Sequence, residues 1–199
     1  LRVLAEELSR REDPAISTNP ENGKVRNLYP VRQEIARWLG EMGPRAVTAV
    51  PALEAALHEE DDPQLRFDAA VALHKIRRDV KAAIPILVDL LERHGYYLYG
   101  DPAAALGEMG EEAAPAVPAL IAALKRDYFA ETAYQHPTAH RDDESGRRLL
   151  TPRRQAVTAL GRIGKPALAA IDALKDALED ADPVVRKEAT EALRRISNP

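Results

Sequence analysis

A repeated unit of 33 or 34 residues constrains the fold of this chain more than any other feature. The segment PRRQAVTALGRIG at 152–164 has counterparts at 31–43, 65–77, 98–110 and 184–196. Each contains a leucine at the same register, and these leucines are spaced by 34, 33, 54 and 33 residues: Leu39, Leu73, Leu106, Leu160 and Leu193. A unit this short cannot bury its own apolar face, so we expect neighbouring units to stack on one another.

A second pattern lies between the segments of the first, for example AVPALEAAL at 49–57 and AVPALIAAL at 116–124. Its leucines are spaced by 34, 33 and 54 residues: Leu57, Leu91, Leu124 and Leu178. The two patterns agree independently on the length of the unit. They also agree that the fourth unit carries an insertion of about 21 residues.

Both patterns predict α-helices. Val50, Leu53 and Leu57 recur at helical spacing, and alanine and leucine dominate the apolar residues. Asp62 and Asp182 each precede a proline, which is typical of the first turn of a helix. Glycines follow the last apolar residue of three helices, where a left-handed cap is expected: Gly43, Gly110 and Gly164.

We therefore expect an all-α fold, a right-handed α-solenoid (α-α superhelix) of about five helical hairpins in a single domain, 1–199. The repeats are placed at approximately 1–43, 44–78, 79–110, 111–164 and 165–199. Their composition and length indicate loop insertions at 14–30 in the first repeat and at 128–151 in the fourth. Trp38 precedes Leu39 directly and is assigned to the core pattern of its repeat.

Three short motifs in these repeats resemble those of the HEAT-repeat family. They are Asp-Pro-x-x-Arg at 62–66 and 182–186, Ala-Leu-Gly-x-Ile/Met-Gly at 105–110 and 159–164, and Val-Pro-Ala-Leu at 50–53 and 117–120. The period is shorter than the usual HEAT length of about 40–47 residues. The chain is in this respect similar to short bacterial HEAT-like repeats of the phycobilisome-lyase type.

The resemblance implies a binding scaffold that presents a long surface to a protein or peptide partner and has no catalytic cleft of its own. It implies that the proline-bearing helices form the convex layer and that the arginine-bearing helices line the concave face. Asp–Arg pairs would then link neighbouring repeats. The arginines that recur at one register are Arg32, Arg66, Arg153 and Arg186.

A tyrosine-rich departure from the repeat suggests where a partner binds. In the third repeat, Tyr99 stands at the register of the repeat arginines, close in sequence to the insertion of the fourth repeat. Tyrosine is favoured at interfaces because it supplies contact area at low entropy cost. Alternatively, these tyrosines fill the space left by a shortened helix. The predicted partner-binding residues are Tyr96, Tyr97, Tyr99, Tyr128, Tyr134, Arg147 and Arg148.

A local basic patch gives an alternative hypothesis, binding of nucleic acid or another polyanion. Its residues are Lys24, Arg26, Arg32, Arg147, Arg148, Arg153 and Arg154. The net charge of −4 argues against a general nucleic-acid binder. Arg153 is also a repeat arginine, which favours a structural role for it, whereas Arg154 stands at a variable register.

We predict no catalytic residues, no metal site and no cofactor. His136 and His140 are four residues apart, but Pro137 disfavours a helix there and no third ligand has a signature spacing. No nucleophile motif, phosphate-binding glycine loop or dinucleotide fingerprint is present. The family resemblance leaves two enzyme-related alternatives open, a glycosylase-like activity on DNA and an accessory or lyase-like role with a tetrapyrrole chromophore. No residue of this chain can be assigned to either.

The sequence contains no cysteine, no apolar run of membrane-spanning length and no recognisable signal peptide. These features leave the compartment open, with the cytoplasm favoured. They also predict no membrane partner.

Overall fold

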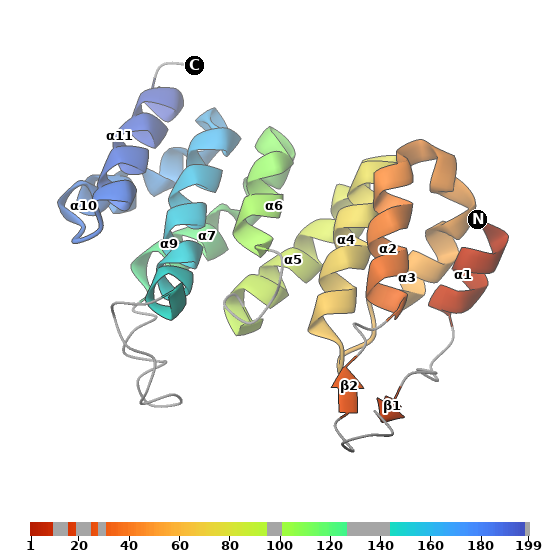
Figure 1. Ribbon diagram of the computed structural model, residues 1–199. Helices are drawn as coiled ribbons and strands as arrows, with labels where there is room; N and C mark the ends of the chain where they lie inside the picture. Colours follow the sequence, from red (N-terminus) through yellow and green to blue (C-terminus); the bar gives the residue numbers. More distant parts are fainter. Residues whose placement is uncertain (10–15, 19–24, 28–30, 95–100, 127–143, 198–199) are drawn as a thin grey trace. The chain divides into compact units, whose positions relative to one another are not determined.

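The structure is a computed structural model and describes residues 1–9, 16–18, 25–27, 31–94, 101–126 and 144–197 (Figure 1). It divides into two compact units, Leu1–Ile86 and Leu87–Pro199. The boundary between them falls inside helix α5, Val80–His94. Each unit is described by itself.

In the first unit, two longer helices lie side by side and two shorter ones pack against them (Figure 1). The longer pair is α2 (Val31–Met42) and α4 (Pro63–Arg77), and the shorter pair is α1 (Arg2–Leu8) and α3 (Val50–Ala56). A 3-10 segment, η1 (Gly43–Ala49), leads from α2 into α3. Strands β1 (Ile16–Thr18) and β2 (Val25–Asn27) pair in antiparallel fashion, with Ile16 opposite Asn27.

The second unit repeats this arrangement. Helix α9 (Glu144–Ile163) packs against both α6 (Pro102–Glu108) and α11 (Pro183–Ser197). On the other side, α7 (Val117–Lys125) packs against α9, and α10 (Ile171–Asp176) packs against α11. The connecting 3-10 segments are η2 (Gly110–Ala116), η3 (Lys165–Ala170) and η4 (Ala177–Glu179).

The repeat leucines form the core of each unit, as the periodicity predicts. Leu39, Leu73, Leu106 and Leu160 are fully buried, and Leu57, Leu91 and Leu124 are nearly so. In the last repeat, Leu178 and Leu193 are only half-buried. The all-α prediction is confirmed, with the short β1–β2 hairpin as an addition. None of the helices within the described ranges has the length and apolar composition of a membrane-spanning segment.

The predicted helix caps are also confirmed. The Asp62 carboxylate accepts a hydrogen bond from the Leu65 amide at the start of α4, and Asp182 accepts one from Val184 at the start of α11. The three predicted glycines, Gly43, Gly110 and Gly164, have φ between 57° and 70°. After α4 the left-handed residue is Arg78, with φ 57°, so this helix end carries no glycine signal.

Close approach between neighbouring helices holds each unit together. A Cβ atom on Gly40 of α2 would lie 3.0 Å from the Cα of Ala72 on α4. In the second unit, a Cβ on Gly107 of α6 would lie 2.9 Å from the Cα of Ala159 on α9. Glycine at this register therefore lets the backbones of consecutive repeats nearly touch.

Two segments that we expected to be loop contain regular structure. Residues 144–151 belong to α9, which continues through Pro152. Arginine and leucine are good helix formers, and a proline removes one backbone hydrogen bond without ending a helix that packing holds in place. Within 14–30, the β1–β2 hairpin replaces the expected irregular chain. The remaining residues of both insertions lie outside the described ranges.

Candidate functional site

The repeat arginines bind the chain itself. Arg32 donates from Nε to the carbonyl oxygen of Leu8 at 2.7 Å. Arg66 and Arg153 make the same bond, at 3.1 Å, to Leu57 and Leu124. These leucines stand at one register, at or next to the carboxyl end of the first helix of each repeat, where carbonyl groups lack helical partners. The arginine thus ties the two helices of its own repeat together.

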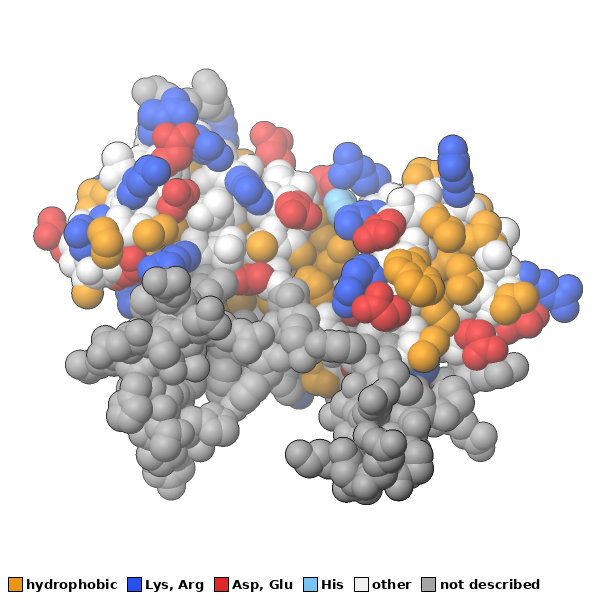
Figure 2. Space-filling model, in the orientation of Figure 1, with side chains coloured by type: hydrophobic (Ala, Val, Ile, Leu, Met, Phe, Trp, Pro, Cys, Tyr) orange, Lys and Arg blue, Asp and Glu red, His pale blue; other side chains and the backbone are white. Residues whose placement is uncertain are grey.

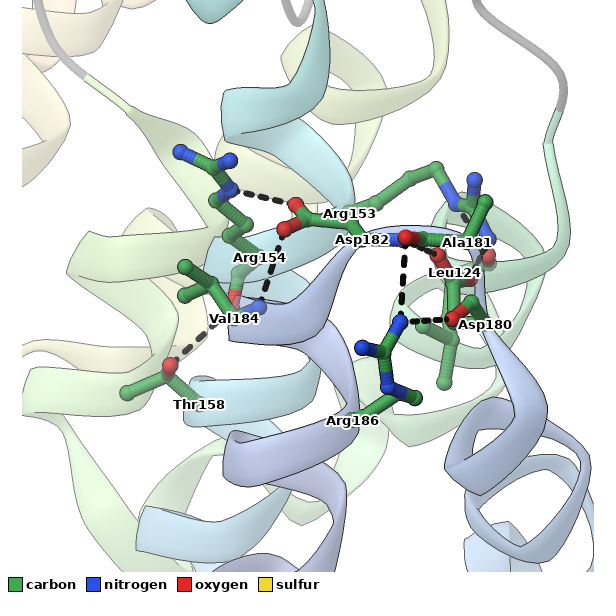
Figure 3. Close-up of polar contacts among 9 residues, drawn as sticks. All are labelled: Leu124, Arg153, Arg154, Thr158, Asp180, Ala181, Asp182, Val184 and Arg186. Carbon is green, nitrogen blue, oxygen red and sulfur yellow. Dashed lines mark hydrogen bonds and ion pairs between the residues drawn. The ribbon is translucent and has the colours of Figure 1, made fainter.

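The same arginines also reach the next repeat. The Nη2 of Arg32 lies 3.1 Å from the carboxylate of Glu59, and the guanidinium of Arg153 pairs with Asp180. Glu59 and Asp180 occupy equivalent positions, two residues after Leu57 and Leu178. The link between neighbouring repeats that the family resemblance implies is therefore present, though its acidic partners differ from those in the motif. Arg186 donates instead to the carbonyls of Asp180 and Ala181 (Figure 3).

A second link runs from the residue after the repeat arginine to the capping aspartate of the next repeat. Gln33 donates to Asp62 at 2.9 Å, and Arg154 donates from Nε to Asp182 at 2.5 Å (Figure 3). Burial raises the pKa of Asp182, but the hydrogen bonds from Arg154 and the Val184 amide outweigh it, and the pKa lies below its usual value. Asp182 is thus an ionised cap with a cationic partner.

Asp101 caps α6 without such a partner among the causes that set its pKa. Its carboxylate accepts hydrogen bonds from the amides of Ala103 at 2.8 Å and Ala104 at 3.2 Å. Burial is the largest influence, and it raises the pKa of Asp101 to about 6 despite those two bonds. The residue at the register of Gln33 and Arg154 in the preceding repeat is Phe67, which has no hydrogen-bonding group.

Asp68 on α4 is a second buried carboxyl that the sequence did not single out. Gln64 donates to it at 3.1 Å, and Arg37 lies 3.8 Å away. Burial raises its pKa, and these two neighbours offset that rise only in part. A carboxyl at this register is found by its surroundings alone, because no motif marks it.

One exposed charged residue from each second helix occupies the same register. In the first unit these are Glu41 on α2 and Lys75 on α4, and in the second they are Glu108, Arg162 and Arg195 on α6, α9 and α11. They lie on the side of the helices away from the core, on backbones fixed by the glycine–alanine approach. Within each unit they form a charged row on a continuous helical surface.

The basic residues predicted for a polyanion site are thus mostly accounted for otherwise or are not described. Arg32, Arg153 and Arg154 donate to oxygen atoms of the chain itself. For three others the structure places only the backbone, Arg26 in β2 and Arg147 and Arg148 in α9. Lys24 lies outside the described residues.

The predicted tyrosines, Tyr96, Tyr97, Tyr99, Tyr128 and Tyr134, lie outside the described residues, as do His136 and His140. In the part of the chain that the structure describes, no group of three or more His, Asp or Glu side chains is arranged to hold a metal ion.

Trp38 is not part of the core. Its side chain is 49% exposed, on the side of α2 that points away from α4. The prediction was wrong because its register is buried only where another second helix lies against it, as α2 lies against Ala72.

Comparison with known proteins supports the repeat assignment. The chain is similar in fold to two engineered proteins solved in a structural genomics programme. The first is 20% identical with a TM-score of 0.47, and the match covers 99% of this chain and 98% of that one. The second is 21% identical with a TM-score of 0.43, covering 98% and 95%. No curated protein sequence matches this chain.

The profile of the HEAT-repeat family, described as HEAT repeats, matches residues 28–98 and 151–199, which make up more than half of the chain. The matched residues include the capping aspartates Asp62 and Asp182 and all four repeat arginines. HEAT-repeat domains generally act as protein-interaction scaffolds. On this match, the chain belongs to the HEAT-repeat family.

Proposed function

We propose that this protein is a non-enzymatic scaffold that binds a protein partner on the outer surface of its second helices. The observation that carries the proposal is the charged row of the second unit, Glu108, Arg162 and Arg195. The helices that bear it approach so closely at Gly107 and Gly161 that the surface is rigid before a partner arrives. A preformed surface avoids the entropy cost of ordering side chains and backbone on binding.

The chemistry of this row favours a polar partner surface that carries both signs of charge. Glu108 and Arg162 stand on adjacent helices, so a partner would place a basic and an acidic group at the matching spacing. Arg195 is held by Glu191 at 2.7 Å, which orients its guanidinium. Charge complementarity of this kind sets specificity and association rate more than affinity.

A photo-crosslinking residue at Arg162 tests the proposal, with the same residue at Asp172 as a matched control. Both positions are exposed, but Asp172 lies on α10, in the first-helix layer. In lysate of the source organism, we expect one protein adduct from position 162 that unlabelled protein competes away. Adducts of equal yield from both positions, or from 172 alone, would overturn the assignment of the surface.

We further propose that the partner reaches the edge of the third and fourth repeats, where Tyr96, Tyr97, Tyr99, Tyr128, Tyr134, Arg147 and Arg148 stand in the sequence. Replacing Tyr96, Tyr97 and Tyr99 together with alanine should weaken the 162 adduct and leave helicity unchanged. An unchanged adduct would remove this edge from the site while leaving the surface of the second helices intact.

The polyanion and tetrapyrrole alternatives receive no comparable support. Arg32, Arg153 and Arg154 are engaged within the chain, which leaves fewer cations for phosphate groups. Retention on heparin that falls steeply with salt would favour the polyanion role. A change in tetrapyrrole absorbance on mixing would favour the relationship to phycobilisome-lyase-type repeats.

A further inference from the structure

The first unit exposes a row of apolar side chains on the side of α2 opposite Gly40. Val31, Trp38 and Met42 are 42%, 49% and 42% exposed, and their spacing of seven and four residues places them on one side of the helix. Val3 on the adjacent helix α1 is 66% exposed. We call these four residues the end face. Figure 2 shows hydrophobic side chains gathered over the part of the first unit where Figure 1 places α2.

The same register is a packing surface elsewhere in the chain. In α4 it holds Leu65, Ala72 and Ile76, and in α11 it holds Val185, Ala192 and Ile196, each at most 5% exposed. Ala72 lies against Gly40 and Ala192 against Gly161, so a helix of the preceding repeat covers this register. The end face is therefore shaped to pack along a helix. Trp38 replaces the alanine and excludes the close approach that glycine allows.

The far side of α11 does not complement this face in another copy. Arg194 stands at the register of Gly40 and Gly161, and Thr190 stands at that of Ala36. Arg194 is exposed and is held 2.8 Å from Glu191. Head-to-tail stacking of copies would bury this charged pair against Trp38, which costs more than the apolar contact returns.

We propose that the end face binds the end face of a second copy, with α2 antiparallel to α2 across a two-fold axis. A two-fold interface needs only one self-complementary surface, which this face supplies. In the antiparallel arrangement Val31 of one copy lies opposite Met42 of the other, and the two Trp38 side chains meet near the axis. The rim along α2 alternates in sign through Glu34, Arg37 and Glu41, as a polar rim around an apolar centre does.

The size of the end face sets the strength of this dimer. Helix α2 has 12 residues. With α1 beside it, the face measures roughly 18 Å by 20 Å. That is about half of the ~800 Å² that each partner contributes to a standard stable interface. We expect a reversible dimer with a dissociation constant on the order of 10–100 µM.

Sedimentation equilibrium of the full chain, combined with tryptophan fluorescence, tests the proposal. Trp38 is the only tryptophan, so its emission reports on the end face alone. Between about 10 µM and about 1 mM, the mass should rise from 21.9 kDa to twice that value. The emission should shift to shorter wavelength with the same midpoint as water leaves the indole.

Two variants separate the end face from the rest of the surface. Trp38→Ala should raise the dissociation constant at least ~10-fold with no loss of helicity, because a buried aromatic anchor is lost. Leu168→Ser removes an equally exposed apolar side chain, 51% exposed on η3, and should leave the dimer unchanged. A constant monomer mass up to about 1 mM would overturn the proposal. So would a dimer that forms without the emission shift or that survives Trp38→Ala.

Discussion

The Nε of Arg154 lies 2.5 Å from Asp182, the carboxylate that caps α11 with a hydrogen bond to the amide of Val184. One aspartate thus serves two repeats, because it starts its own helix and receives a cation from the previous one. Gln33 and Asp62 repeat the arrangement in the first unit with a neutral donor. This double use makes the capping aspartates the most informative positions for mutation.

Asp182→Ala should destabilise the protein by about 1–3 kcal/mol, because it removes a helix cap and leaves Arg154 without its partner. Urea denaturation followed by circular dichroism measures the change. Asp172→Ala is the control, since that exposed carboxylate pairs only with Lys175 on the surface and should cost less than about 0.5 kcal/mol. Equal losses in the two variants would contradict the role of Asp182.

The pH dependence of Asp182 follows from its lowered pKa. A carboxyl whose pKa is lower in the folded state stabilises the fold above its unfolded pKa, near 3.9, and loses this contribution as the pH falls through the folded value. Asp182→Asn should therefore lower stability at neutral pH and show a weaker loss on acidification than the native chain. Parallel curves for the two proteins below about pH 4 would show that Asp182 is not ionised by its neighbours.

Asp101 should behave in the opposite sense. Burial raises its pKa to about 6, so its contribution to stability is full below the unfolded pKa and is lost as the pH rises through about 6. Asp101→Asn keeps an acceptor for the amides of Ala103 and Ala104 but cannot ionise. The variant should lose less stability than the native chain between about pH 4 and pH 6. A carboxyl carbon of Asp101 that titrates near 4 in an NMR experiment would contradict this prediction.

The periodicity was sufficient to predict the helices and much of the core. Leu39, Leu73, Leu106 and Leu160 are buried because a helical apolar stripe has one side to bury, and the sequence displays that side directly. The caps at Asp62 and Asp182 were predictable for the same reason, since a cap is a local feature set by a few consecutive residues.

Features that depend on the neighbouring repeat were not predictable. Trp38 matches the core register but lacks a covering helix, and the sequence pattern alone does not contain that information. Arg154 stands at a variable register, and only the structure shows that it meets Asp182. The start of α9 was missed because the strong repeat signal begins at Pro152, whereas the helix itself begins at Glu144.

Arg153→Lys should cost nearly as much stability as Arg153→Gln, about 1–3 kcal/mol, although it keeps the charge. Arg153 binds the Leu124 carbonyl through Nε and the Asp180 carboxylate through a terminal nitrogen, and lysine cannot reach two acceptors with this fork. Urea denaturation measures both variants. Arg162→Lys, at an exposed position on the same helix, should be neutral within about 0.5 kcal/mol. A neutral Arg153→Lys would show that charge alone holds this link.

Gly161→Ala tests how closely the repeats approach, because two effects predict opposite signs. At an open position in a helix, replacing glycine with alanine stabilises the helix by up to about 1 kcal/mol. Here the new Cβ would lie 2.9 Å from the Cα of Ala192 and 3.0 Å from its Cβ, so α9 and α11 must separate. We expect a net destabilisation of about 1–3 kcal/mol by urea denaturation. Arg162→Ala, the exposed next residue, is the control for helix propensity alone. Equal or greater stability in Gly161→Ala would mean that α9 and α11 lie farther apart than the 2.9 Å approach requires.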